Sequence, residues 1–315
     1  MENNFSDEIV YALTAAPQFG TSPQAHCYAA CSSGLMRSTD GGKTWHLAFE
    51  SLNLADPVPV TTAFLPLDSS STPTVLAGLV GGILRSHDGL TGWERLTLPQ
   101  PPPAISAIIA SPNYAQDDIL FAATLEDGVL WSSNRGDHWI NWNFGLLDLN
   151  ILSLCISPAF GEDETLFAGA QSGVFRTTNG GRAWREVDLP IGYDAVLSLA
   201  VSPGFKQDGI VFAGTEMKGL LFSSDAGDTW QQIAPEIFSG SVNAVLLDPD
   251  FPSRPEILVL VDGTALYSTD QGQTWQTWQP EITHDREVTA VFAPHGFQTG
   301  KPALIGMVGG DIHLV

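Results

Sequence analysis

The sequence is poor in basic residues and in long apolar runs. Its 315 residues include 13 lysines and arginines against 35 aspartates and glutamates, which gives a formal net charge of −22. Binding to a phosphate backbone requires a basic surface, so we expect no nucleic-acid partner. The same charge would be repelled by an anionic membrane surface. No apolar stretch is long enough to span a bilayer, and membrane insertion is therefore not predicted.

Cysteine is also scarce, with only Cys27, Cys31 and Cys155 present. An odd number argues against a full disulfide framework. Cys27 and Cys31 would be roughly 13 Å apart along an extended strand, too far for a direct bridge. We therefore predict packed, reduced thiols.

The first eight residues have neither the basic region nor the apolar region of a signal peptide. This predicts a cytoplasmic protein, or a secreted or luminal one if the sequence has been trimmed.

What the sequence does have is an internal repeat. The pattern Ser/Thr-x-Asp/Asn-x-Gly-x-x-Trp is called the box here, and its copies are numbered in chain order. The six boxes span residues 38–45, 86–93, 132–139, 177–184, 223–230 and 268–275. The glycine of box 2 is displaced. The closing tryptophans follow one another at intervals of 45 to 48 residues, a regularity that indicates a repeat architecture.

Each repeat also carries short apolar runs separated by Pro, Gly and Asx turns. In the fifth repeat these runs cover residues 195–201, 210–214 and 219–222, and another extended run follows Trp230. Runs of this length between turn signals are typical of strands. Four strands in a period of about 46 residues predict the blades of a β-propeller.

Counting the repeats predicts one all-β domain over residues 1–315, a single seven-bladed β-propeller of four-stranded antiparallel blades. The last 40 residues supply three strands, at 287–293, 303–307 and 311–315. We expect residues 1–5 to join the last blade as its fourth strand and close the ring, which would remove free sheet edges. A three-stranded last blade is the alternative. The expected blades cover approximately 8–50, 58–97, 105–145, 151–189, 195–235, 241–280 and 287–315 plus 1–5.

The box residues are interpreted as structural. The third position can accept hydrogen bonds from N–H groups of the turn, and the glycine tolerates a positive φ. We expect the tryptophan to be buried between sheets while its N–H finds a hydrogen-bond partner. The third positions are Asp40, Asp88, Asn134, Asn179, Asp225 and Asp270, and the tryptophans are Trp45, Trp93, Trp139, Trp184, Trp230 and Trp275. Because an amide cannot replace a carboxylate in acid–base catalysis, the two asparagines argue against a catalytic role.

These six copies resemble the Asp-box, or BNR repeat. This box is shared by sialidases, the sortilin ectodomain, xyloglucan-degrading glycoside hydrolases and the photosystem II stability/assembly-factor family. The resemblance covers nearly the whole chain and implies the propeller fold, with each box between the third and fourth strands, at the blade periphery and away from the binding sites. The photosystem II family is the nearest analogue in size and blade count, but it is usually exported and presents a basic patch.

Strand alternation predicts two different faces. The turns between second and third strands and the connections from each fourth strand to the next blade share one face, called the loop face here. We expect the loop face to bind the partner. Its candidate residues are Glu126, Asp127, Tyr193, Asp194, Glu216, Lys218, Phe238, His284, Asp285 and Arg286.

No catalytic residue, cofactor or metal site is predicted. Sialidase chemistry needs convergent arginines, whereas Arg37, Arg85 and Arg176 occupy one repeat position around the ring. The related polysaccharide hydrolases place their cleft between two propellers, and one ring is too little for it. The histidines show no metal-ligand spacing, and no glycine pair precedes a phosphate-loop Lys-Ser/Thr.

Two functions remain open. The leading hypothesis is a non-catalytic scaffold for protein–protein interaction or complex assembly, whose partner has a basic or mixed surface that complements the acidic chain. The alternative is a carbohydrate-binding or glycoside-hydrolase-like propeller, for which Tyr193, Phe238, Trp142 and Trp278 are the available aromatic platforms. Packing between blades or on the rim is the other interpretation of the two tryptophans.

Overall fold

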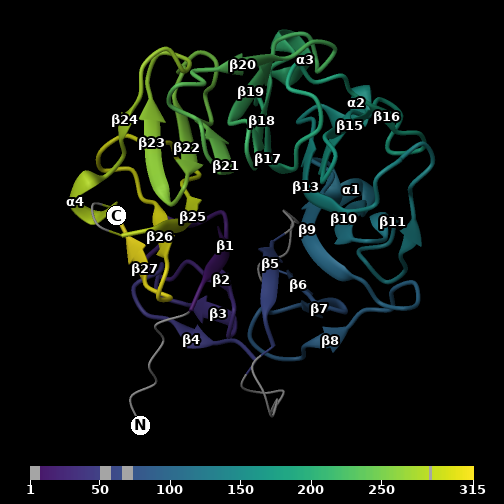
Figure 1. The fold of residues 1–315 in the computed structure, drawn as a ribbon. Coiled ribbons are helices and arrows are strands. Elements are labelled where there is room, and N and C mark those ends of the chain that lie inside the picture. The colour runs from purple at the N-terminus through teal and green to yellow at the C-terminus, as the bar shows by residue number, and fades with distance from the viewer. Residues whose placement is uncertain (1–7, 50–57, 66–73, 284–285) are drawn as a thin grey trace.

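The computed structural model describes residues 8–49, 58–65, 74–283 and 286–315. Their strands form seven antiparallel sheets arranged around one axis (Figure 1). Six sheets have four strands, and the seventh has three within the described residues. The predicted all-β, seven-bladed propeller is thus confirmed. No helix in these residues is long and apolar enough to cross a membrane.

The strands follow the chain from blade to blade. Blade 1 contains β1 (Val10–Ala15), β2 (Cys27–Cys31), β3 (Gly34–Ser38) and β4 (His46–Leu47). Blade 2 contains β5 (Val60–Phe64), β6 (Val75–Leu79), β7 (Gly82–Ser86) and β8 (Glu94–Arg95). Blade 3 contains β9 (Ala104–Ala110), β10 (Leu120–Leu125), β11 (Gly128–Ser132) and β12 (Ile140–Asn141). Blade 4 contains β13 (Ile151–Ile156), β14 (Leu166–Ala170), β15 (Val174–Thr177) and β16 (Arg185–Glu186).

The remaining blades repeat the pattern. Blade 5 contains β17 (Val196–Val201), β18 (Val211–Thr215), β19 (Leu220–Ser223) and β20 (Gln231–Ile233). Blade 6 contains β21 (Val242–Leu247), β22 (Ile257–Val261), β23 (Thr264–Ser268) and β24 (Gln276–Thr277). Blade 7 contains β25 (Val288–Phe292), β26 (Leu304–Met307) and β27 (Ile312–Leu314). Short helices α1 (Tyr114–Asp117), α2 (Phe160–Asp163), α3 (Phe205–Asp208) and α4 (Pro280–Thr283) lie in the connections.

The core lies between the blades. The first strand of each blade is nearest the axis (Figure 1), and the second strand is covered on both sides by neighbouring sheets. Every residue of β2, β6, β14, β18 and β22 is therefore buried. A strand buried on both faces has a nearly continuous apolar sequence rather than an alternating one, as Ile257–Val261 shows.

An inner row of hydrogen bonds joins consecutive blades close to the axis. A hydroxyl on the first strand of one blade donates to a first-strand carbonyl of the next. Ser153 donates to Val196 over 3.1 Å and Ser198 donates to Val242 over 3.0 Å. Thr61 and Ser106 make the equivalent bonds to Ile105 and Ile151. These bonds satisfy buried carbonyls between blades.

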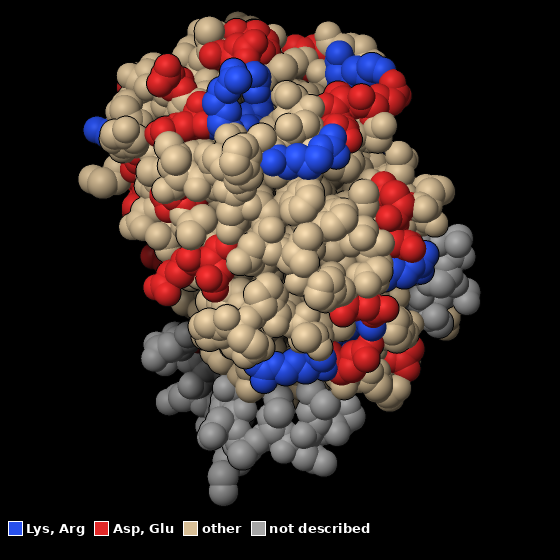
Figure 2. All heavy atoms as spheres, turned by 90° about the vertical axis from the view of Figure 1, so that its right-hand side faces the viewer, with Lys and Arg blue, Asp and Glu red and all other residues tan. Residues whose placement is uncertain are grey.

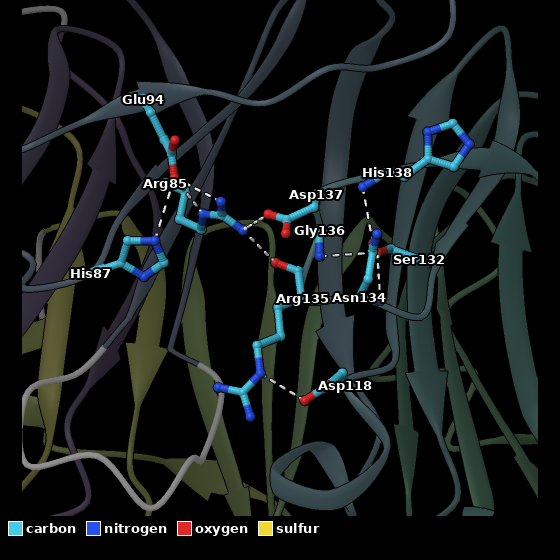
Figure 3. A network of polar contacts seen from close by, with 10 residues as sticks. All are labelled: Arg85, His87, Glu94, Asp118, Ser132, Asn134, Arg135, Gly136, Asp137 and His138. Carbon is cyan, nitrogen blue, oxygen red and sulfur yellow. Dashed lines mark hydrogen bonds and ion pairs between the residues drawn. The ribbon is translucent and has the colours of Figure 1, made fainter.

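An outer row of contacts uses the boxes. In boxes 2 to 5 the carbonyl of the fourth box residue accepts a hydrogen bond from the preceding blade, although the donor differs between blades. The donor–acceptor pairs are Tyr28 to Gly89, Arg85 to Arg135, Trp142 to Gly180 and Arg176 to Ala226. Figure 3 shows the second pair, in which Arg85 also forms ion pairs with Glu94 and Asp137, both at 2.7 Å. Arg85 and Arg176 thus join neighbouring blades, in agreement with the argument against a sialidase.

The connections between first and second strands are held by a polar pair six residues apart. In blade 5, Ser202 donates its hydroxyl to Asp208 over 2.6 Å, and blades 3 and 4 have the same arrangement. In blade 6 the pair is replaced by Asp248 and Arg254, whose ion pair measures 3.1 Å. Because Asp248 is fully buried, its charge requires this partner.

Blade 7 closes the ring against blade 1. Phe19 packs edge-to-face on Phe292 with ring centroids 5.7 Å apart, and its carbonyl lies 2.7 Å from Nε2 of His295. Gly306 of β26 faces Val10 of β1 so closely that a Cβ would lie 2.6 Å from the valine side chain. Residues 1–5, predicted as the fourth strand of blade 7, lie outside the described residues.

Replacing Trp142 by Phe tests the outer row of contacts. Trp142 donates its indole N–H to the buried carbonyl of Gly180 over 2.8 Å and stacks on Trp131. Losing the donor leaves that carbonyl unsatisfied, so we expect the free energy of unfolding in urea to fall by about 1–3 kcal/mol. Trp131→Phe is the control, because the N–H of Trp131 makes no hydrogen bond within the described chain. Equal losses in both variants would contradict the role of the hydrogen bond.

Candidate binding face

Hydrogen bonds show that the boxes close their own turns. In box 5, Ser223 donates to Oδ1 of Asp225 over 2.8 Å and accepts the N–H of Gly227 over 2.9 Å. Thr229 donates two hydrogen bonds to the carboxylate of Asp225, from its N–H over 2.8 Å and from its hydroxyl over 2.5 Å. Boxes 1 and 6 repeat all four bonds. The structural interpretation of the third-position carboxylates is consistent with these contacts.

The residue type at the third position correlates with a hydroxyl later in the box. Each aspartate uses its second oxygen to accept a threonine hydroxyl, from Thr44, Thr91, Thr229 or Thr274. The boxes with Asn134 and Asn179 have His138 and Ala183 at the corresponding position, and only the backbone N–H of these residues is bound. An amide keeps one acceptor oxygen but has an NH₂ group in place of the second.

These bonds lower the pKa of the box carboxylates. The hydroxyl of Thr229, with the backbone N–H of the same residue, lowers the pKa of Asp225 from 3.8 to about 2. Thr274 does the same for Asp270, whose pKa is also about 2, and the pKa values of Asp40 and Asp88 are lowered as well. The box carboxylates therefore stay ionised where a general acid would need a proton.

The box tryptophans are only partly as expected. Trp45, Trp230 and Trp275 donate their indole N–H to the box glycine carbonyl, and Trp184 donates to Trp142. The buried indole nitrogens of Trp93 and Trp139 have no hydrogen-bond partner within the described residues. The expectation that each N–H would be bound is wrong at these two positions.

Carboxylates fix the connections of the loop face. Asp194 accepts the N–H of Ala195 over 3.0 Å and that of Met217 over 3.0 Å, which ties the connection after blade 4 to a turn of blade 5. Asp148 does the same one blade earlier, accepting Asn150 over 2.9 Å and Ser172 over 2.8 Å. Asp194 is only 9% exposed, and its carboxylate binds backbone N–H groups of two segments, so it is a positioning residue. The sequence analysis missed Asp148, although it precedes its strand as Asp194 does.

The other candidate residues separate into accessible and inaccessible ones. Glu126, Glu216, Lys218 and Arg286 are exposed, Asp127 is half-buried, and Tyr193 is 78% exposed. Arg286 is paired with Asp311 over 3.0 Å. His284 and Asp285 lie outside the described residues.

The prediction that Phe238 is available for binding on the loop face is wrong. It is fully buried and packs edge-to-face on Trp275, with centroids 4.8 Å apart, because the connection after blade 5 folds its ring into the interface with blade 6.

The two tryptophans considered as platforms are packing residues. Trp142 lies in the stack with Trp131, with ring centroids 4.7 Å apart and an angle of 18° between the rings. Trp278 is 5% exposed and donates its N–H to the carbonyl of Phe297 over 2.9 Å. Of the four aromatic residues proposed to bind a sugar, Tyr193 alone presents a largely exposed ring.

Exposed apolar side chains are concentrated on the loop face. Of the twelve large hydrophobic residues that are exposed within the described chain, nine lie in its turns and connections or at their edges. These nine are Val80, Leu125, Phe144, Leu147, Leu149, Tyr193, Met217, Ile237 and Val308. Phe144, Leu147 and Tyr193 are the most exposed, each at 78%. Figure 2, which turns the rim of the ring with β11 and β16 to the viewer, shows uncharged atoms over its middle with both acidic and basic groups around them.

These side chains belong to a continuous surface. The connection over residues 142–150 carries Phe144 and Leu147, and its Asp148 holds Ser172 of the next turn. Ser172 lines a small pocket together with Tyr193 of the connection over residues 187–195. That connection is in turn bound to Met217 through Asp194. The surface from residues 142–150 to residues 216–218 is called the docking sector below.

The charges of the loop face differ from those of the box face. Several arginines and lysines of the boxes and their neighbouring connections form ion pairs, for example Arg135 with Asp118 (Figure 3) and Arg176 with Asp228. In the loop-face segments between residues 126 and 263, Lys218 is the single basic residue. The acidic residues there are Glu126, Asp127, Asp148, Asp188, Asp194, Glu216, Glu236 and Asp262.

We find neither a reactive thiol nor a cluster of metal ligands in the described part of the chain. All three cysteines are free, and burial raises the pKa of Cys27 and Cys31 to about 12. A thiol with this pKa is almost entirely protonated at neutral pH and a poor nucleophile. The described residues contain no group of three or more His, Cys, Asp or Glu side chains able to hold a metal ion.

Comparison with known proteins agrees with this geometry. The model of the BNR/Asp-box repeat matches residues 36–47 and 266–279, which include box 1 and box 6. The chain is a seven-bladed β-propeller built on BNR/Asp-box repeats. A sequence comparison with curated proteins finds no match.

Three similar solved structures represent different proteins. The extracellular domain of BT4673 from B. thetaiotaomicron has a TM-score of 0.71 at 14% identity, over 98% of this chain and 38% of that one. YCF48 bound to D1 peptide has a TM-score of 0.68 at 16% identity, over 97% and 92%. The GH74 xyloglucanase from Xanthomonas campestris has a TM-score of 0.69 at 16% identity, over 98% and 52%.

These likenesses show the fold. The chain spans 38% of the length of the BT4673 domain and about half of the xyloglucanase.

Replacing Thr229 by Val tests the box network. A carboxyl with a lowered pKa stabilises the fold above its ordinary pKa of 3.8, and this contribution is lost as the pH falls through about 2. Without the hydroxyl, we expect the pKa of Asp225 to rise toward 3.8. The variant should be less stable than the wild type at pH 7, with a smaller difference near pH 2. NMR titration of the Asp225 carboxyl and urea unfolding at both pH values measure this.

Thr229→Ser is the control, because it keeps a hydroxyl and should keep the low pKa. An unchanged pKa of Asp225 in the valine variant would contradict the assignment of the hydroxyl as its main cause.

Proposed function

We propose that this protein is a non-catalytic scaffold whose docking sector binds a segment of a partner protein. One observation carries the proposal: Phe144, Leu147 and Tyr193, each 78% exposed, project from two consecutive connections of one face. Exposed apolar side chains gathered in one region and bordered by polar groups are typical of protein interfaces. Large apolar and aromatic residues also supply most of the binding energy at such surfaces.

The docking sector is held rigidly by the propeller. Asp148 and Asp194 bind backbone N–H groups on both sides of their connections, and Gly128 donates to the carbonyl of Leu149 over 2.9 Å. A surface ordered before binding loses little conformational entropy on association. This arrangement suits a docking platform whose shape is independent of its partner.

The acidic excess of the loop face favours a partner with a basic or mixed surface. Eight carboxylates accompany one lysine in the segments between residues 126 and 263, and the whole chain carries a formal charge of −22. Opposite charges across an interface accelerate association and exclude partners of the same sign. That YCF48, a propeller of similar length, is known bound to a peptide supports a protein partner on this fold.

Carbohydrate binding is the second candidate function. Tyr193 offers an exposed ring beside carboxylates, a combination that also suits a sugar, and the GH74 xyloglucanase shares the fold. A glycan array distinguishes the two candidates, because a docking scaffold should give no signal on it.

The double variant Phe144→Ser/Leu147→Ser tests the docking sector. Affinity capture from cells of the source organism should recover one dominant protein with the wild type, and the variant should recover at least about tenfold less, because the apolar anchors are lost. The control, Leu47→Ser/Leu314→Ser, changes two exposed residues of the outer strands β4 and β27 and should capture as the wild type does. Equal capture by both double variants would exclude the docking sector as the interface.

Salt dependence tests the acidic surface. Raising the salt concentration from about 0.05 to about 0.5 M shortens the range of charge interactions, so we expect the association rate constant with the captured partner to fall by about tenfold. Surface plasmon resonance measures this rate. A rate unaffected by salt would contradict electrostatic steering.

A further inference from the structure

A pocket opens inside the docking sector at blade 4. Its volume is about 250 Å³, and it lies between the turn at residues 171–173 and the chain segment at residues 186–193. Ser172 and Gly173 line one side, and Leu189, Gly192 and Tyr193 line the other. A pocket of this size accommodates one long side chain and lies just below the usual range for small-molecule pockets, which begins at about 300 Å³.

The charged groups of the pocket are carboxylates. Glu186 and Asp188 both line it, and both are exposed. Neither forms an ion pair within the described part of the protein, whereas Glu162, Glu164 and the other paired acids of the box face do. The neighbouring cation, Arg185, is exposed and does not line the pocket.

The remaining lining suits the uncharged part of a basic side chain. Val187 and Leu189 contribute apolar surface against which an alkyl stem can pack while its charged head remains near the carboxylates and water. Tyr193 contributes a largely exposed aromatic ring, which attracts a cation placed over its face. Lining of this kind favours a long side chain with a positive end.

We infer that the blade 4 pocket receives the side chain of a lysine or arginine from the docked partner. The inference rests on the proposed function, because it names the part of the partner that enters the docking sector. Glu186 and Asp188 bind the cationic head, Val187 and Leu189 contact the stem, and Tyr193 covers it. The partner segment therefore carries a basic residue beside the apolar residues that meet Phe144 and Leu147.

Short synthetic peptides test the pocket without knowledge of the partner. The probes are capped nonapeptides of glycine, serine and leucine that differ only at the central residue, which is arginine, lysine, citrulline or norleucine. Binding is followed by NMR through the backbone amides of Ser172, Gly173 and Gly192. The arginine and lysine peptides should shift these amides with dissociation constants at least about tenfold lower than those of the citrulline and norleucine peptides.

Two double variants that remove the same charge show whether binding of the arginine peptide depends on the carboxylates of the pocket. Glu186→Gln/Asp188→Asn should weaken the arginine peptide at least about tenfold. Glu126→Gln/Asp127→Asn removes the same charge from the same face outside the pocket, and it should change binding less than about twofold. Tyr193→Ala should weaken binding about threefold, and Tyr193→Phe should retain it, because a phenylalanine ring also attracts a cation.

Equal binding of the arginine and citrulline peptides would overturn the assignment of the pocket, and so would equal weakening by the two double variants. Shifts of the same amides by cellotetraose but by none of the basic peptides would overturn it in favour of a sugar.

Capture of the partner by two variants distinguishes a failure of this inference from a failure of the proposed function. Capture lost in Phe144→Ser/Leu147→Ser but complete in Glu186→Gln/Asp188→Asn would overturn the pocket while supporting the docking sector.

Discussion

The contact between each box and the preceding blade is the constraint on which the ring depends. The box glycine has no side chain, and a side chain of the preceding blade occupies that space. A Cβ on Gly181 would lie 2.5 Å from Trp142, and one on Gly227 would lie 2.6 Å from Phe167. Gly42 meets Leu304 of blade 7 in the same way, so this contact also closes the ring. Larger residues would force the blades apart, because packed interiors leave no spare volume.

The contact between a box and the preceding blade is made by different residue types in different blades. The fourth-position carbonyl of the box accepts a tyrosine hydroxyl, an indole N–H or a guanidinium, yet it is bound by the preceding blade in each of these cases. The polar pair six residues apart also differs between blades. Blade 5 has a serine–aspartate hydrogen bond, and blade 6 has the ion pair of Asp248 and Arg254. What the fold requires is a satisfied buried polar group, and several residue types can satisfy it. The divergence of the repeats outside the box follows from this tolerance.

The polar groups of the box face are used by the fold itself, whereas several of those on the loop face are not. The box carboxylates are bound by hydroxyl and N–H groups of their own turns, and Arg85 and Arg176 of the box face are paired. The pocket residues Glu186 and Asp188 have no ion-pair partners within the described chain, and they adjoin the exposed Tyr193. A partner that covers the exposed apolar groups and brings opposite charge to the neighbouring carboxylates would complement this surface.

The sequence by itself determined the repeat, the number of blades and the hydrogen bonding within the boxes, because these depend on residues a few positions apart. It also placed Glu126, Glu216 and Tyr193 on an exposed face through strand alternation. Only the tertiary structure decided that Phe238 turns into the next blade, that Asp194 binds backbone, and that Phe144 and Leu147 remain outside. The pocket between residues 171–173 and 186–193 was likewise invisible in the sequence. Whether a connection buries or exposes a side chain depends on the neighbouring blade, and no local spacing encodes that contact.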